Sequence, residues 1–155
     1  MLIRDYRPED APVLARLFFE TVHRINSRDY SPAQVSAWAP AIPASERWHA
    51  RLAASETVVA AEADRVLGFA SLEADGHIDL LYCDADCIGR GVGSALLARL
   101  EAGARRRALA RLYTEASITA RPFFERRGYR VLRRREFERA GVTLVNFAME
   151  KALRA

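Results

Sequence analysis

The chain has 155 residues, of which 50% are hydrophobic, and it carries a net charge of +4 at pH 7. This length suits one domain whose core needs no metal or disulfide, and no apolar run approaches the roughly 20 residues of a membrane-spanning helix. We therefore expect one cytoplasmic domain over residues 1–155 that binds no membrane, with Cys83 and Cys87, the only two cysteines, as reduced thiols.

The first third of the chain is predicted to be a short strand followed by three helices. Pro8 with the acidic residues after it is typical of a helix start, and apolar residues follow at helical spacing. Ser31 before Pro32 predicts the cap and first turn of another helix. The predicted elements are a strand over Leu2–Tyr6, a helix from Pro8 to about Asn26, a short helix from Ser31 that ends by Pro40, and a helix from about Ser45.

The remaining two thirds alternate between strand-like and helical periodicity. Three consecutive strands predict an antiparallel meander, and the strand–helix–strand unit after it requires one parallel pairing. We therefore predict an α/β fold with a mixed, mostly antiparallel sheet of about seven strands flanked by helices. The predicted segments are strands Thr57–Ala63, Val66–Glu73 (after a turn at Asp64–Arg65) and His77–Asp84, a helix opened by Gly89–Gly93, strand Arg111–Ala116, helix Thr119–Arg127, and a hairpin of Tyr129–Arg139 and Val142–Lys151.

Arginine supplies all of the basic side chains except Lys151, and it clusters at Arg105–Arg107, Arg126–Arg127 and Arg133–Arg135. Such clusters occur in nucleic-acid-binding proteins, on solvated faces and around polyanionic ligands. No nucleic-acid-binding motif accompanies them, so we expect no nucleic-acid partner. Steeply salt-dependent binding to DNA or RNA would support that alternative.

The segment Ile88–Ser94 reads IGRGVGS and lies between a predicted strand and an amphipathic helix. Glycines permit positive φ, and the free amides and dipole of a helix N-terminus favour phosphate, to which Arg90 could add a charged donor. A dinucleotide-binding loop would instead follow the first strand of a β-α-β unit, and a Walker loop would need a lysine before Ser94. The segment therefore predicts a diphosphate site, with a glycine-rich helix start that binds no ligand as the alternative.

Two motifs resemble those of the GNAT superfamily of acetyltransferases. Ile88–Gly93 is similar to the signature Gln/Arg-x-x-Gly-x-Gly/Ala, and Ser117–Tyr129 is similar to Asn-x-x-Ala-x-x-Phe-Tyr-x-x-x-Gly-Phe. The likeness extends from Ile3 to Lys151, and Tyr30–Trp38 looks like the YafP-type branch. The resemblance implies a splayed cleft between strands four and five. It also implies acetyl-CoA as co-substrate, no metal, and direct acetyl transfer to a primary amine of a small molecule or peptide in a ternary complex.

The same resemblance implies that coenzyme A lies along this cleft, where main-chain groups of strand four polarise the thioester carbonyl as an oxyanion hole does. Three positions depart from the family pattern: Ile88 replaces Gln or Arg, Ser117 replaces Asn, and Phe124 replaces the tyrosine that commonly protonates the leaving thiolate. A phenyl ring has no proton to donate. The implied cofactor-binding residues are Leu81, Tyr82, Cys83, Ile88, Gly89, Arg90, Gly91, Val92, Gly93, Ser94, Ser117, Phe123 and Phe124.

Because that tyrosine is absent, the catalytic acid and base have to be sought elsewhere. Strict alternation places His77, Asp79 and Leu81 on one face of strand four, and the residues between them, with Tyr82, on the other. Some family members carry a glutamate base in a register that matches His77. His77 and Asp79 are thus candidate bases, directly or through water, with a solvent-facing His77 as the alternative. Tyr82 is a candidate acid, or simply a packed aromatic residue.

The acceptor pocket is expected between the N-terminal helices and the terminal hairpin, with His23, Tyr30 and Trp38 as candidate lining residues and Trp48 in the core. The sequence leaves the acceptor open, and the protein could be a monomer or a homodimer. A non-catalytic acyl-CoA-binding module is a further alternative, favoured by Phe124. Cofactor binding without turnover would identify such a module.

Overall fold

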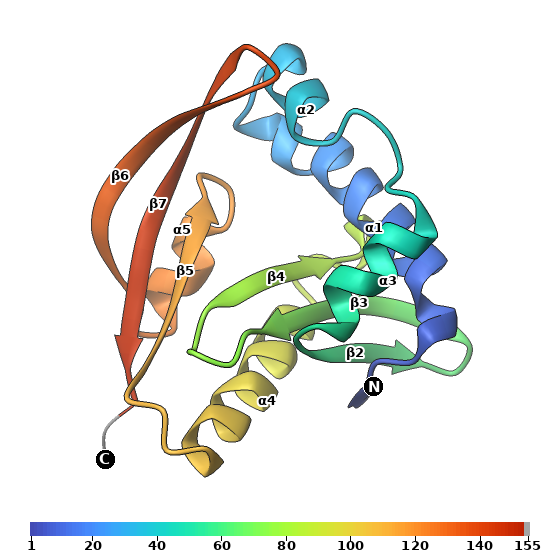
Figure 1. The fold of residues 1–155 in the computed structure, drawn as a ribbon, viewed down its shortest axis with the longest axis vertical. Coiled ribbons are helices and arrows are strands. Elements are labelled where there is room, and N and C mark those ends of the chain that lie inside the picture. Colours follow the sequence, from blue (N-terminus) through green and yellow to red (C-terminus); the bar gives the residue numbers. More distant parts are fainter. Residues whose placement is uncertain (154–155) are drawn as a thin grey trace.

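The computed structural model describes residues 1–153, which form seven strands, five α-helices and three short 3₁₀ helices (Figure 1). The order of elements predicted from the sequence is confirmed. The strands are β1 (Leu2–Asp5), β2 (Glu56–Glu62), β3 (Arg65–Leu72), β4 (Ile78–Cys83), β5 (Arg111–Ser117), β6 (Arg130–Arg139) and β7 (Val142–Ala152). The helices are α1 (Ala11–Arg24), α2 (Pro32–Trp38), α3 (Ser45–Ala53), α4 (Val92–Arg106) and α5 (Arg121–Arg126), with 3₁₀ turns at Pro8–Asp10, Asn26–Arg28 and Ala85–Cys87. None of the helices in residues 1–153 is long and apolar enough to cross a membrane.

The strands form two antiparallel sheets, in the orders β1-β2-β3-β4 and β5-β7-β6, that meet at one point. A single parallel bridge pairs His77 with Tyr113, and close by Thr114 Oγ1 donates to the Ile78 carbonyl at 3.0 Å. Beyond this junction, no ladder joins β4 to β5 in the described part of the chain. The predicted splay between the fourth and fifth strands is confirmed, and it leaves one edge of β4 without a strand partner.

Helices cover both faces of the first sheet, as Figure 1 shows, with α4 on one face and α1 and α3 on the other. Leu96 of α4 and Leu14 and Leu52 of α1 and α3 are fully buried, and such burial contributes about 1.5–3 kcal/mol for each leucine. The β6–β7 hairpin arches toward α2 (Figure 1), where Gln34 Nε2 donates to the Thr143 carbonyl at 3.0 Å. The helices and the hairpin thus enclose the region into which the two sheets diverge.

Local sequence signals set most element boundaries. Ser31 Oγ accepts from the Gln34 amide at 3.1 Å and Gln34 Oε1 accepts from the Ser31 amide at 2.9 Å, which is a capping box. The predicted start of α2 is therefore confirmed. The turn between β2 and β3 occupies residues 63–64, one residue before the predicted position, because Ala63 rather than Arg65 leaves the strand and adopts a φ of 55°.

A bulge in β4 overturns the strict alternation expected from the sequence. Two successive β3 residues pair with Ile78 and Leu80, so Asp79 is an extra residue without an opposite partner. Ile78 consequently lies on the α4 side together with Leu81, whereas Leu80 shares the α1 side with Tyr82. The predicted alternation is wrong because the bulge re-aims the side chains on either side of it.

Candidate active site

Two adjoining cavities open where the sheets diverge. The first, of about 540 Å³, extends from the Ile88–Ser94 loop between β4 and β5. The second, of about 380 Å³, lies between β4, α2 and the β6–β7 hairpin. The residues that border both cavities are Trp38, Asp79, Tyr82, Glu115 and Ser117. A molecule in each cavity would therefore meet its neighbour at these side chains.

The glycine loop presents the N-terminus of α4 to the first cavity. Gly89 and Gly91 have φ values of 84° and 82°, and Gly91 is the N-cap of α4, with no side chain bonded to the cap. An added Cβ at either glycine would meet nothing within 4 Å, so these positions need glycine for its backbone conformation. The first amides of any α-helix lack an intrahelical acceptor, and here they border a cavity. This geometry fits an anion such as a diphosphate.

The basic side chains beside the loop differ from the prediction. Arg90 lies outside the cavity lining and reaches Glu62 Oε1 at 3.4 Å. Arg127, from the end of α5, borders the cavity, lies over the Phe123 ring at 3.9 Å and donates from Nε to Ser94 Oγ at 3.0 Å. The positive charge next to the loop thus comes from Arg127, at the end of α5. The Ile88–Gly93 motif could not have indicated this residue.

The middle of the first cavity is bordered by β4 on one side and by β5 and α5 on the other. The predicted residues Leu81, Tyr82, Cys83, Ser117, Phe123 and Phe124 all line it. Phe124 is 3% exposed and packs edge-on against Tyr129 and Phe123, so it forms an apolar wall. Ser117 Oγ accepts from the Ala120 amide at 3.0 Å, which fixes the turn before α5. The structure brings this predicted group together.

Tyr82 lies where the two cavities meet, with its ring edge-on to Phe18 at 5.0 Å and stacked on Phe69 at 6.0 Å. Burial raises the pKa of Tyr82 well above its ordinary value. The hydroxyl therefore stays protonated at neutral pH and is able to donate a hydrogen bond.

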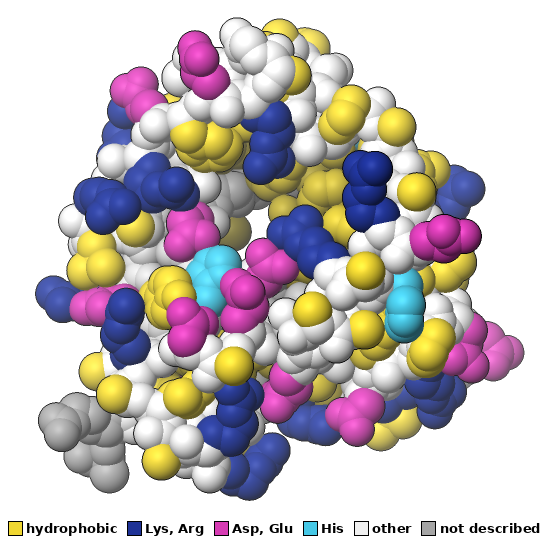
Figure 2. Space-filling model, in the orientation of Figure 1, with side chains coloured by type: hydrophobic (Ala, Val, Ile, Leu, Met, Phe, Trp, Pro, Cys, Tyr) yellow, Lys and Arg dark blue, Asp and Glu magenta, His cyan; other side chains and the backbone are white. Residues whose placement is uncertain are grey.

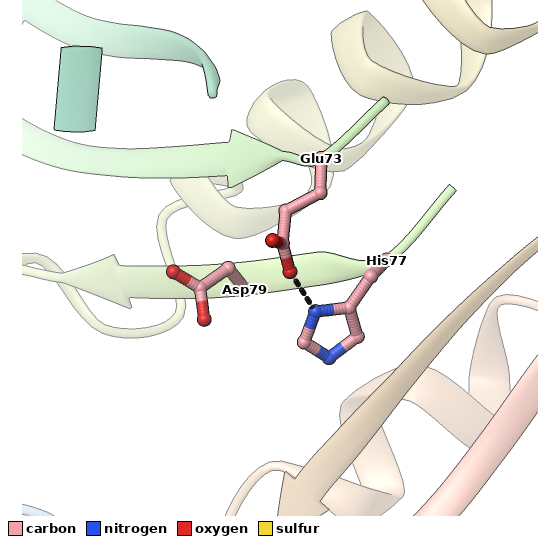
Figure 3. A group of neighbouring side chains, drawn as sticks. All are labelled: Glu73, His77 and Asp79. Atoms are coloured by element: carbon pink, nitrogen blue, oxygen red, sulfur yellow. Dashed lines mark hydrogen bonds and ion pairs between the residues drawn. The ribbon is translucent and has the colours of Figure 1, made fainter. Parts of the chain in front are cut away.

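His77 is held between two carboxylates and does not line either cavity. Its Nε2 bonds Glu115 Oε1 at 2.7 Å. Its Nδ1 bonds Glu73, as Figure 3 shows. The bond to Glu115, reinforced by Glu73 and opposed by burial, raises the pKa of His77 to about 9. At neutral pH the ring is an imidazolium with both nitrogens engaged, so it has no lone pair with which to accept a proton.

Two carboxylates, Asp79 and Glu115, line both cavities. Both oxygens of Asp79 accept from Arg51, at 2.9 and 3.0 Å. Glu115 uses Oε1 for His77, while its Oε2 has no hydrogen-bond partner among residues 1–153. The bond from His77 lowers the pKa of Glu115 and keeps it ionised. Sequence reasoning missed Glu115, although alternation along β5 places it on the same face as Ser117.

Glu73, His77 and Asp79 also bring potential metal-ligand atoms within 4.8 Å of one another (Figure 3). These donors are already engaged, because His77 bonds two carboxylates and Arg51 occupies both oxygens of Asp79. A metal ion would have to displace these contacts. The hydrogen-bond network alone therefore accounts for the cluster.

The three residues predicted to line the acceptor pocket are divided. Trp38 and Tyr30 border the second cavity, and the buried Tyr30 hydroxyl donates to the Val145 carbonyl at 2.6 Å. His23 borders neither cavity, and its Nε2 bonds the Ala39 carbonyl at 2.7 Å. The structure thus places two of the three at the expected pocket.

Comparison with known proteins agrees with this geometry. The family model for the "Acetyltransferase (GNAT) domain" matches residues 26–151. The uncharacterized N-acetyltransferase YafP of Escherichia coli (strain K12) is 38% identical over 147 residues, which cover 95% of this chain and 93% of YafP.

Solved structures show the same fold. A crystal structure described as "GCN5-Related N-acetyltransferase: Aminotransferase, Class-II", from Rhodopseudomonas palustris, is 38% identical, has a TM-score of 0.92, and covers 97% of this chain and 94% of its own. YncA from Salmonella typhimurium, solved with its cofactor acetyl-CoA, is 19% identical with a TM-score of 0.76, over 100% of this chain and 95% of its own. The chain thus belongs to the GNAT family of N-acetyltransferases.

Proposed function

We propose that the protein transfers the acetyl group of acetyl-CoA directly to the primary amine of a small molecule. The observation that carries the proposal is that the uncapped N-terminus of α4 borders a cavity which adjoins a second one. The first cavity would hold acetyl-CoA and the second the amine. The acetyl-CoA seen with the structurally similar YncA supports the first assignment.

The residues of the first cavity fit coenzyme A. The free amides of Val92, Gly93 and Ser94, with Arg127 beside them, suit the diphosphate. Gly93 leaves little room for any larger residue, because an added Cβ would lie 3.0 Å from the Phe123 ring. The apolar wall around Phe124 and the open edge of β4 suit a thin chain that carries amide groups.

Bound acetyl-CoA supplies an activated acyl carbon with a thiolate leaving group, and the protein's own groups orient the reaction around it. Main-chain amides at Leu81 or Cys83 would hold the carbonyl oxygen, because both residues line the cavity along the open edge of β4. Loss of one such donor costs about 10²–10³ in rate. In the overall reaction a C–N bond forms and the C–S bond breaks, which gives an amide, a free thiol and one released proton.

Glu115 and Tyr82 are the groups best placed to move protons. Glu115 borders both cavities, and its Oε2, which has no hydrogen-bond partner among residues 1–153, would take a proton from the substrate ammonium. Tyr82 borders both cavities and carries a hydroxyl proton that it would give to the leaving thiolate. Glu115 thus takes the role of base for which His77 and Asp79 were the candidates, and Tyr82 keeps the role of candidate acid.

The test is to mix the purified full-length chain with acetyl-CoA and a panel of primary amines and to follow both free thiol and the acetylated product by mass. Thiol release that requires an amine and yields an equal amount of amide is the expected result. Acetyl-CoA binding without thiol release on any amine would contradict the proposal and identify the non-catalytic acyl-CoA-binding module instead.

A further inference from the structure

The second cavity has an uneven distribution of charge along its length. The carboxylates Asp79 and Glu115 lie at its junction with the first cavity, whereas three arginines border the second cavity alone: Arg51 from α3, and Arg135 and Arg139 from β6. Figure 2 shows a hollow near the centre of the molecule with basic and acidic side chains around its rim. The charged side chains shared by the two cavities are thus carboxylates, and those that border the second cavity alone are all arginines.

The pairing of these groups leaves positive charge in excess. Arg51 is neutralised by Asp79. Among residues 1–153, neither Arg135 nor Arg139 forms an ion pair with a carboxylate. Arg135 donates to the neutral Asn146 Oδ1 at 3.1 Å, and both guanidinium groups lie near the Phe137 ring, at 5.6 and 5.9 Å. The Phe137 ring thus lies beside both guanidinium groups, and most of the N–H donors of Arg135 and Arg139 have no partner among residues 1–153.

Strand geometry directs the two arginines into the same space. Residues 135, 137 and 139 of β6 share one face of the strand by alternation, and all three border the second cavity. Arg133, on the same strand, is exposed and borders neither cavity. Guanidinium groups bind carboxylates and phosphates through paired, charge-assisted hydrogen bonds.

We infer that the acceptor is a small amine that also carries a carboxylate or phosphate group, with its ammonium at Glu115 and its anionic group between Arg135 and Arg139. This inference rests on the proposed acetyl transfer. The cavity volume of about 380 Å³ lies at the lower end of the ~300–1,000 Å³ typical of small-molecule sites. Trp38 and Tyr30 border the same cavity and provide an apolar wall for the carbon chain between the two charged ends.

Matched probes test the anionic group directly. They are ω-amino acids of three to six carbons, their primary amides, and aminoalkylphosphonates of the same length, each assayed with acetyl-CoA and the full chain. We expect kcat/KM for the carboxylates or the phosphonates to exceed that of the amides by about tenfold or more, because hydrogen bonds to charged groups are stronger than those to neutral amides. The class of probe with the higher kcat/KM, carboxylate or phosphonate, then shows whether the anionic group of the acceptor is a carboxylate or a phosphate. Equal use of acids and amides would overturn the inference.

The variants Arg135→Gln, Arg139→Gln and the double variant should each reduce that preference, and the double variant should abolish it. Arg133→Gln is the matched control, since it removes the same charge from the same strand outside the cavity, and it should leave the preference intact. Thermal unfolding of each variant checks the fold. A preference that survives in a folded double variant would contradict the inference.

Equilibrium binding separates this inference from the proposed transfer. Titration of the ω-amino acids into the protein without coenzyme A, followed by NMR, should show binding that the double variant loses. If that binding is seen but no probe is acetylated, the acyl transfer fails and the anion site stands. If amides are acetylated as well as acids, the transfer stands and the anion site fails. No binding and no acetylation of any anionic probe would also overturn the anion site.

Discussion

The two cavities that meet at Tyr82 are built in different ways. The first is formed by main chain, through a glycine loop, the first turn of α4 and the unpaired edge of β4. The second is formed by side chains from several elements, with arginines from α3 and β6 and aromatic residues around them. A site made of main chain depends on a few local residues, whereas a site made of side chains depends on how distant elements are packed. We expect the first to tolerate sequence change poorly and the second to set the specificity for the acceptor.

The largest effect is expected for Glu115→Gln, a change at the junction of the two cavities. This change removes the proposed proton acceptor and should lower kcat by about 10²–10⁴-fold, the usual contribution of general base catalysis, with acetyl-CoA affinity unchanged. Rapid thiol-release kinetics and calorimetric titration measure the two quantities. Glu138→Gln, an exposed residue of β6, is the control. Full activity of the Glu115 variant would remove this residue from the mechanism.

Gly91→Val tests the main-chain site. A β-branched residue at a φ of 82° is strained by about 1–3 kcal/mol, which the loop would relieve by turning its amides away. Acetyl-CoA affinity, measured by calorimetry, should fall about 10–100-fold. Gly141→Val provides the control, because Gly141 has a similar φ of 76° but lies in the β6–β7 turn, outside both cavities. Equal losses in both variants would mean that general instability, not the loop, is responsible.

Arg127→Gln and Arg90→Gln together test which basic residue serves the loop. Arg127 borders the first cavity and bonds Ser94, so its loss should weaken acetyl-CoA binding about tenfold. Arg90 faces Glu62, and its loss should have little effect. The opposite ranking in the same calorimetric titration would show that Arg90 turns toward the ligand.

The smallest expected effect is on stability, in His77→Gln. The pKa of His77 is raised to about 9 by Glu115 and Glu73, and the Tyr113 ring packs beside it. A raised pKa means that the stabilisation is fully present below the unfolded value of about 6.5 and is lost as pH rises through 9. Solvent screens this partly exposed pair of contacts, so the variant should be less stable by about 1 kcal/mol at pH 6 and nearly equal to the parent at pH 10. Denaturant unfolding across this range measures the difference, and a gap that does not change with pH would contradict it.

The sequence predicted the main-chain elements around the first cavity much better than the side chains that surround the second. Glycine spacing and strand periodicity are local signals, so the Ile88–Ser94 loop and the order of elements could be predicted. The bulge at Asp79 could not, since it depends on the register with β3. Glu115 was missed because its importance comes from His77, 38 residues earlier in the chain. His23 was assigned to the acceptor pocket because helical spacing alone does not show what a side chain faces.

Among residues 1–153, one isolated bridge between His77 and Tyr113 joins the two sheets, which otherwise share little backbone hydrogen bonding. A ligand with its own amide groups, laid along the open edge of β4, would act as a temporary extra strand and complete hydrogen bonding that the polypeptide leaves unfinished. We therefore expect acetyl-CoA to slow amide hydrogen exchange in both β4 and β5, so that the fold reaches full rigidity only when it holds its co-substrate.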